Sequence, residues 1–125
     1  MEKIVIEATK FTPQITLDPV GKVEIIGKSF PENTYEFYAP ILKWLQTYFE
    51  TDSSPKDLVV NMEIIYFNSS SSKLFFDFFD ILDNKKDSFN IQINWIYDEK
   101  NESALESGED FKDDFEDLLI NLVAK

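Results

Sequence analysis

The feature that most constrains the fold is a change of hydrophobic period in the middle of the chain. Residues 58–67 are nearly all apolar and rich in Val and Ile, which is typical of a central strand covered on both faces. From residue 74 to residue 82, apolar side chains recur instead at the three- and four-residue steps of a helix. A strand followed this closely by a helix predicts an α/β arrangement.

A polar stretch, residues 68–73, joins this predicted strand to the predicted helix. It consists of Asn68, four serines and Lys73. Asn and Ser side chains commonly accept the free backbone N–H groups of a first helical turn, so one interpretation is a simple helix cap. The same N–H groups and the helix dipole favour negative charge, so a serine hydroxyl here is also a suitable attachment point for phosphate. The local sequence leaves both interpretations open.

Patterning elsewhere predicts the remaining elements. Short apolar or alternating runs predict strands at residues 4–6, 14–17, 22–27 and 89–95, with the second and third joined as a hairpin through residues 18–21. A helix is predicted from Thr34, and Pro40 requires either a kink or a later start near Ala39. Phe37 and Trp44 fall off its apolar stripe, so they are candidate exposed contacts for a protein partner.

The C-terminal part is predicted as an acidic connection, residues 98–108, followed by an amphipathic helix over residues 111–123. The predicted order is β-β-β-α-β-α-β-α. We therefore expect an α/β fold, a mixed β-sheet of about five strands with three main helices, as a single domain over residues 1–125.

Composition excludes several function classes. The chain has no cysteine and no histidine, which removes thiolate chemistry and the commonest general base and transition-metal ligand. Its formal net charge is -12, so it should be repelled by nucleic acid and by anionic membranes, and its partners should present basic or apolar surfaces. The chain shows neither a signal peptide nor a segment long enough to span a bilayer, so we expect no membrane insertion and a cytoplasmic location.

Three enzymatic or ligand-binding possibilities were considered. Ten carboxylates lie from Asp98 to Asp117, and a small acidic metal-binding protein or enzyme that uses them is the alternative function, although no calcium-loop spacing is present. The Gly27-Lys28-Ser29 sequence lacks the rest of a phosphate-binding loop. Lys73 beside Ser72 is a weak nucleophile–base pair without oxyanion-hole glycines. We expect no catalytic residue, no metal and no cofactor.

Several motifs occur together and in order along the chain. They are TPQI at residues 12–15, GKSFPEN at 27–33, FYAP at 37–40, YFNSSSSK at 66–73, WIYD at 95–98 and ESGE at 106–109. In this combination the chain resembles the SiaC-like regulatory phosphoprotein family of bacteria, over most of its length. The resemblance implies a STAS-like fold, as in anti-sigma-factor antagonists, and a role in partner switching within cyclic di-GMP signalling and biofilm regulation.

The resemblance also implies partners and a modified residue. A cognate protein kinase would phosphorylate the hydroxyl that follows the asparagine, here Ser69, and a PP2C-type phosphatase would remove the phosphate. Family members usually carry threonine at this position; the neighbouring Ser70 and Ser71 are alternative sites. The unphosphorylated form would bind a downstream signalling target, in the best-known case a diguanylate cyclase.

The partner-binding surface is expected to join two loops at one end of the sheet. Its expected residues are Ser29, Pro31, Glu32, Asn33, Asn68 and Ser70. A purely structural interpretation of the first loop is that Asn33 caps the first helix.

Overall fold

Six strands form one sheet in the computed structural model, which describes residues 1–125, and they lie side by side in chain order. The strands are β1 (Ile4–Ile6), β2 (Gln14–Asp18), β3 (Lys22–Ser29), β4 (Asp57–Phe67), β5 (Asn90–Tyr97) and β6 (Leu119–Ala124). The helices are α1 (Thr34–Glu50), α2 (Ser69–Asp83) and α3 (Glu102–Asp114). β1, β2 and β3 pair antiparallel, and β3 to β6 pair parallel.

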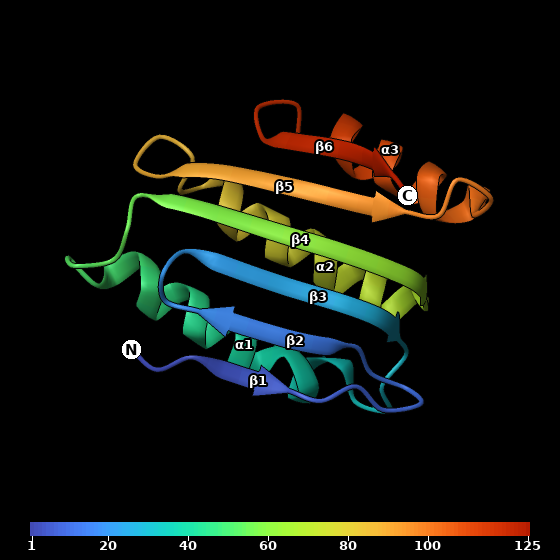
Figure 1. Cartoon of the computed structure of the whole chain (residues 1–125), viewed down its shortest axis with the longest axis horizontal. Helices are drawn as coiled ribbons and strands as arrows, with labels where there is room; N and C mark the ends of the chain where they lie inside the picture. The colour runs from blue at the N-terminus through green and yellow to red at the C-terminus, as the bar shows by residue number, and fades with distance from the viewer.

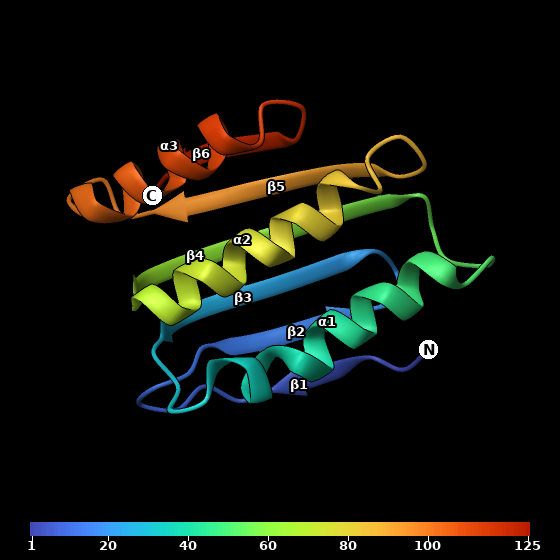
Figure 2. The same cartoon turned by 180° about the vertical axis from the view of Figure 1, so that it is seen from behind.

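All three helices cover the same face of the sheet (Figures 1 and 2). Each helix connects two neighbouring parallel strands, and such crossovers are almost always right-handed. Because the strand order advances in one direction from β3 to β6, right-handed crossovers bring every helix to one face. The predicted mixed α/β fold, the β2–β3 hairpin and the number of helices are confirmed, with one strand more than expected and with the third helix in a different place.

The core lies between the helices and this face of the sheet. Aromatic side chains fill much of it, and the largest fully buried ones are Tyr38, Tyr48, Phe75, Phe78, Phe79 and Trp95. The prediction that β4 is covered on both faces was wrong, because the burial of its residues alternates along the strand. β4 is central in the sheet, but its second face is open to solvent (Figure 1).

The predicted C-terminal helix over residues 111–123 was also wrong. The helix α3 begins at Glu102, inside the predicted connection, where the side chain of Asn101 accepts a hydrogen bond from the Ala104 N–H. α3 ends at Asp114, and residues 119–124 form β6. The apolar residues of the two elements happen to continue one helical period across the turn that joins them.

The first helix settles the alternatives left open around Pro40. α1 starts at Thr34, so Pro40 lies inside the helix, and Asn33 caps it by accepting a hydrogen bond from the Glu36 N–H at 3.0 Å. Trp44 is buried and stacks on Tyr48, and Phe37 is half-buried against the core. The prediction that these two aromatics are exposed contacts was therefore wrong, because α1 buries a wider face than its main stripe.

Candidate functional site

Ser69 lies at the carboxyl end of the parallel strands, where β4 passes directly into α2. It is the first residue of α2, and its side chain is exposed. Asn68 caps the helix, since its Oδ1 accepts a hydrogen bond from the Ser71 N–H at 2.9 Å. The predicted cap is thus confirmed, and it leaves the hydroxyls of Ser69 and Ser70 facing solvent.

A β-bulge in β4 sets the direction of this junction. The pairing with β3 runs from Gly27 opposite Ile64 to Lys28 opposite Tyr66, so Ile65 is the extra residue. A bulge shifts the alternation of side chains by one position. As a result Phe67 turns toward the core, where it contacts Phe75, and the next residues start α2 over the helical face.

A buried network of hydroxyl groups lies directly beneath the first turn of α2. The Ser29 Oγ is 2.8 Å from the Ser71 Oγ and 2.6 Å from the Tyr38 Oη, and all three side chains are buried. Burial raises the pKa of Tyr38 to about 12, although its hydrogen bond with Ser29 acts in the opposite direction. The network joins β3, α1 and α2, and it buries Ser71 away from any modifying enzyme.

The predicted partner-binding residues lie near one another at this end of the sheet, but not all of them reach the surface. The Asn68 N–H donates to the Ser29 carbonyl at 3.1 Å, so the loop after β3 begins beside the start of α2. Ser29 and Pro31 are buried, whereas Glu32, Asn33 and Ser70 are exposed. Ser29 can therefore act on a partner only through the residues it supports.

A groove between α2 and α3 borders Ser69. It has a volume of about 510 Å³. Its lining residues are Phe67, Ser69, Ser72, Lys73, Phe76, Asp77, Ser107, Asp110, Phe111 and Asp114. The groove thus combines aromatic rings with three carboxylates and one lysine. The sequence does not predict this groove, because its second wall comes from α3, which lies N-terminal to the predicted C-terminal helix.

The other candidate sites predicted from the sequence are the acidic C-terminal segment and the Ser72–Lys73 pair. The described residues contain no group of three or more Asp or Glu side chains that could hold a metal ion. Lys73 is exposed and makes no hydrogen bond to Ser72. No helix has the length and apolar character needed to cross a bilayer.

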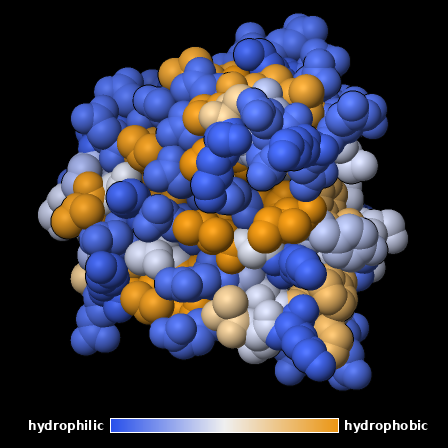
Figure 3. Space-filling model, turned by 45° about the vertical axis from the view of Figure 1, so that its right-hand side comes forward, coloured by the Kyte–Doolittle hydropathy of each residue, from blue (hydrophilic) through white to orange (hydrophobic).

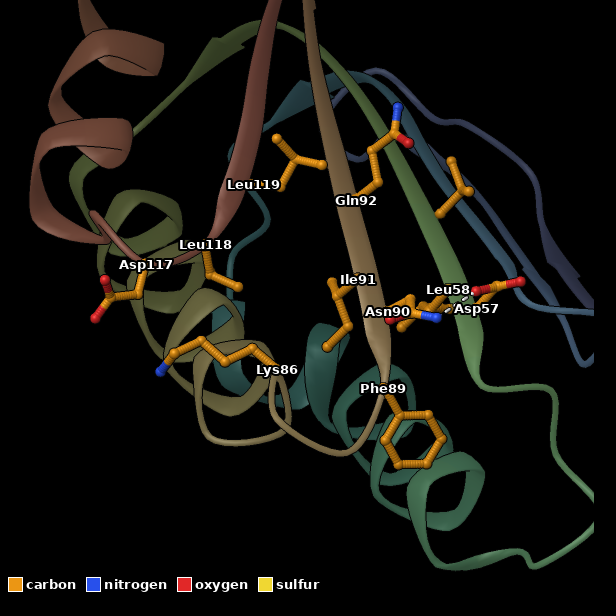
Figure 4. Close-up of a pocket in the computed structure, with 11 residues that line it drawn as sticks. Asp57, Leu58, Lys86, Phe89, Asn90, Ile91, Gln92, Asp117, Leu118 and Leu119 are labelled. Atoms are coloured by element: carbon orange, nitrogen blue, oxygen red, sulfur yellow. Dashed lines mark hydrogen bonds between the residues drawn. The ribbon is translucent and has the colours of Figure 1, made fainter.

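A second pocket, of about 500 Å³, lies at the opposite end of the sheet, at the amino ends of β4, β5 and β6 (Figure 4). Three of its polar side chains are already paired. Asp57 Oδ1 accepts a hydrogen bond from Asn90 Nδ2 at 2.9 Å, and Lys86 pairs with Asp83 at 3.1 Å, which raises the pKa of Lys86. Ligands of open α/β sheets bind at the carboxyl ends of the strands, so the Ser69 end is the better candidate site.

Comparison with known proteins identifies the family of the chain. The family described as SiaC family regulatory phosphoprotein matches residues 6–125. The chain belongs to the SiaC family. A curated relative, an uncharacterized protein of Pseudomonas aeruginosa strain UCBPP-PA14, is 30% identical over 116 residues, which cover 91% of this chain and 90% of the relative.

Solved structures of SiaC proteins have the same fold. Apo-SiaC from Pseudomonas aeruginosa is 27% identical, with a TM-score of 0.90 over 99% of this chain and 100% of that one. A second structure shows the diguanylate cyclase SiaD of that bacterium in complex with its activator SiaC. Its match is 27% identical, with a TM-score of 0.88 over 98% of this chain and 99% of that one. The SiaC family resemblance predicted from the motifs is thereby confirmed.

Proposed function

We propose that this protein is a phosphorylation-switched adaptor whose unphosphorylated form binds and regulates a diguanylate cyclase. The observation that carries the proposal is the exposed Ser69 hydroxyl at the start of α2, in a family of regulatory phosphoproteins. The SiaC protein that is solved with a diguanylate cyclase shares this fold. A cognate kinase adds the phosphate to Ser69, and a PP2C-type phosphatase removes it.

The switch works through local charge. Phosphate adds about -1.5 to -2 of charge and three strong acceptors. The N–H groups of Ser69 and Ser70, which precede the capped N–H of Ser71, are available to the phosphate, and Lys73 follows one turn later. Within the protein, a phosphate at this position is therefore tolerated.

The same phosphate would weaken the binding of a partner that docks at this end of the sheet. Asp77, Asp110 and Asp114 already line the groove beside Ser69. A partner surface that packs against the neutral hydroxyl would have to desolvate a dianion after phosphorylation, next to carboxylates that already make this surface negative. Binding is therefore lost without a change of fold.

Phosphosite mapping by mass spectrometry tests the modification, on protein taken from its native cells with phosphatases quenched at lysis. We expect phosphate on Ser69. Phosphate on Ser70 alone would move the site by one residue. Absence of phosphate from a well-covered peptide in every growth condition would overturn the switch.

Activity assays test the regulation. The variants Ser69→Ala and Ser69→Glu are compared as activators of purified diguanylate cyclase from the same bacterium, with cyclic di-GMP formation as the readout. We expect Ser69→Ala to activate and Ser69→Glu to lose at least about tenfold in affinity, which corresponds to about 1.4 kcal/mol. Ser88→Ala and Ser88→Glu, at an exposed serine at the opposite end of the sheet, are the matched controls. Equal activity of the two Ser69 variants would indicate an interaction domain without a switch.

A further inference from the structure

The two edges of the sheet differ in how they are protected. β1 is only three residues long and is flanked by the charged residues Lys3 and Glu7. β6 has six residues, Leu119–Ala124, with no charge, no proline and no bulge in its pairing with β5. Natural proteins usually protect a long edge by one of these devices, because unpaired backbone groups recruit further strands. β6 carries none of them.

The outward backbone groups of β6 can be assigned from one hydrogen bond. The Lys125 N–H donates to the Tyr97 carbonyl of β5 at 2.8 Å. Because N–H and C=O groups alternate in direction along a strand, the groups of Ile120, Leu122 and Ala124 point away from β5. No strand lies beyond β6, which is the outermost strand in Figure 1. Ile120 is only 2% exposed, so its outward groups are covered, whereas Leu122 is half-buried and Ala124 is exposed. Two donors and two acceptors, those of Leu122 and Ala124, are therefore available at this edge.

On the open face of the sheet, the side chains of β6 alternate between apolar and polar. Leu119 and Val123 are 55% and 39% exposed there. Between them, Asn121 Nδ2 donates to Asn94 Oδ1 at 3.1 Å, and Asn94 Nδ2 donates to Asn61 Oδ1 at 2.8 Å. Both hydrogen bonds run from β6 toward β4. The Asn121 Oδ1, at the β6 end of this row of asparagines, therefore accepts no hydrogen bond from another residue of the chain. Figure 3 shows this open face obliquely, as hydrophobic patches between hydrophilic side chains.

The charge near β6 favours one kind of strand over another as its pairing partner. α3 lies over β5 and β6 and carries six carboxylates against one lysine, namely Glu102, Glu106, Glu109, Asp110, Asp113, Asp114 and Lys112. A second copy would bring another acidic α3 alongside, and the like charges of the two helices would repel. A strand that carries basic side chains on the α3 side meets opposite charge instead.

We propose that β6 is a docking edge for an extended, basic segment of a partner protein, which adds a seventh strand to the sheet. On the open face the segment places apolar side chains beside Leu119 and Val123 and a hydrogen-bond donor, such as Asn or Lys, opposite Asn121. On the other face its alternate residues are Lys or Arg, near α3. Main-chain hydrogen bonds supply affinity and the alternating side chains supply specificity. The proposal does not depend on phosphorylation of Ser69.

The test uses the unmodified full chain and a capped peptide, Lys-Val-Lys-Asn-Lys-Val-Lys. A scrambled peptide of the same composition and charge, Val-Lys-Lys-Asn-Lys-Lys-Val, is the matched control, because it lacks the alternation. By NMR amide exchange we expect the first peptide to slow exchange at Leu122 and Ala124, while the already bonded amides of Asn121 and Val123 change little. Equal effects of both peptides, or changes confined to other elements, would overturn the proposal.

Edge variants give a second readout. Ala124→Pro removes an outward N–H without removing a bond to β5, so the fold remains while peptide affinity falls at least about tenfold. Val123→Lys places a charge on the open face of the edge and should weaken binding similarly, whereas Val5→Lys on β1 should not. If ultracentrifugation shows a dimer that Ala124→Pro dissociates, the occupant is a second copy and the proposed partner segment is wrong.

Discussion

The four serines after Asn68 occupy four different environments, although the sequence presents them as a uniform run. Ser69 is exposed beside the groove, Ser70 is exposed, and Ser72 is half-buried in the groove wall. Ser71 is buried against Ser29. Its hydroxyl is therefore structural, and the proposed phosphorylation concerns the exposed residues at the start of the run.

Tyr38 gives the hydroxyl network a dependence on pH. Its pKa is raised to about 12 in the folded protein, largely by burial, against an ordinary value of 10.0. The unfolded chain therefore loses this proton first, so the contribution of Tyr38 to stability is complete below pH 10 and is lost as the pH rises toward 12. The loss has a slope of up to about 1.4 kcal/mol per pH unit.

Urea unfolding of Tyr38→Phe tests this effect. At pH 8 we expect the variant to be less stable by about 1 kcal/mol, the value of one net hydrogen bond. Between pH 10 and 12 the difference from the unmodified protein should shrink and then change sign, because the unmodified protein loses about 2 kcal/mol over this range while phenylalanine has no proton to lose. A difference that stays constant over this range would show that Tyr38 titrates alike in both states.

At the residue scale, the cap and the exposed serine could be predicted because their chemistry is local. Asn68 and Ser69 follow from the rules for a helix start, and the family motif selects Ser69. Tyr38 could not be recognised as a partner of Ser29, since it lies on the apolar stripe of α1 and looks like any core aromatic. Its role depends on a contact between elements, which no spacing in the sequence records.

At the scale of elements, the position of α3 depends on one close approach. A Cβ on Gly108 would lie 2.5 Å from Trp95 Cδ1 and 2.9 Å from Leu122 Cδ2. The helix therefore rests directly on β5 and β6 at this point. Trp95 also donates its Nε1–H to the Ala104 carbonyl of α3 at 2.8 Å, so the same side chain both packs against α3 and holds it by a hydrogen bond.

Gly108→Ala should therefore destabilise the protein, although alanine is the better helix former by about 1 kcal/mol. We expect a net loss of about 1–3 kcal/mol in the free energy of unfolding, from displacement of Trp95 and its hydrogen bond. Trp95 fluorescence and urea unfolding measure the change. Ser107→Ala, one residue earlier in the same helix, is the control and should change stability by less than about 0.5 kcal/mol. Stabilisation by Gly108→Ala would contradict the close approach.

The elements that the sequence predicted correctly are those with an unambiguous period or a clear boundary. β5 alternates cleanly, and the β2–β3 hairpin has Pro19 and Gly21 in its turn. The boundary between α3 and β6 has neither glycine nor proline, and a helical stripe can be traced across it. The signals that could have separated them are Asn101 as a cap and the uncharged, largely aliphatic residues 119–124.

At the scale of the whole molecule, charge is far from balanced. The chain has 24 acidic and 12 basic residues, and the structure contains three ion pairs, none of them buried. Repulsion among unpaired carboxylates therefore acts against the compact state. Salt screens this repulsion, since the Debye length falls to about 10 Å at 0.1 M, while few attractive pairs are present to be weakened.

Thermal unfolding between 20 and 300 mM NaCl should therefore show a rise in Tm of a few degrees, roughly the shift that 1 kcal/mol produces in a domain of this size. The double variant Glu109→Lys/Asp113→Lys is the matched comparison. Both positions are exposed on α3, and the two reversals change the net charge from -12 by four, to -8. It should have a higher Tm at low salt and a smaller salt dependence, because less repulsion remains to be screened. A Tm that falls with salt would show instead that attractive pairs dominate, and it would also weaken the argument that an acidic α3 keeps a second copy away from β6.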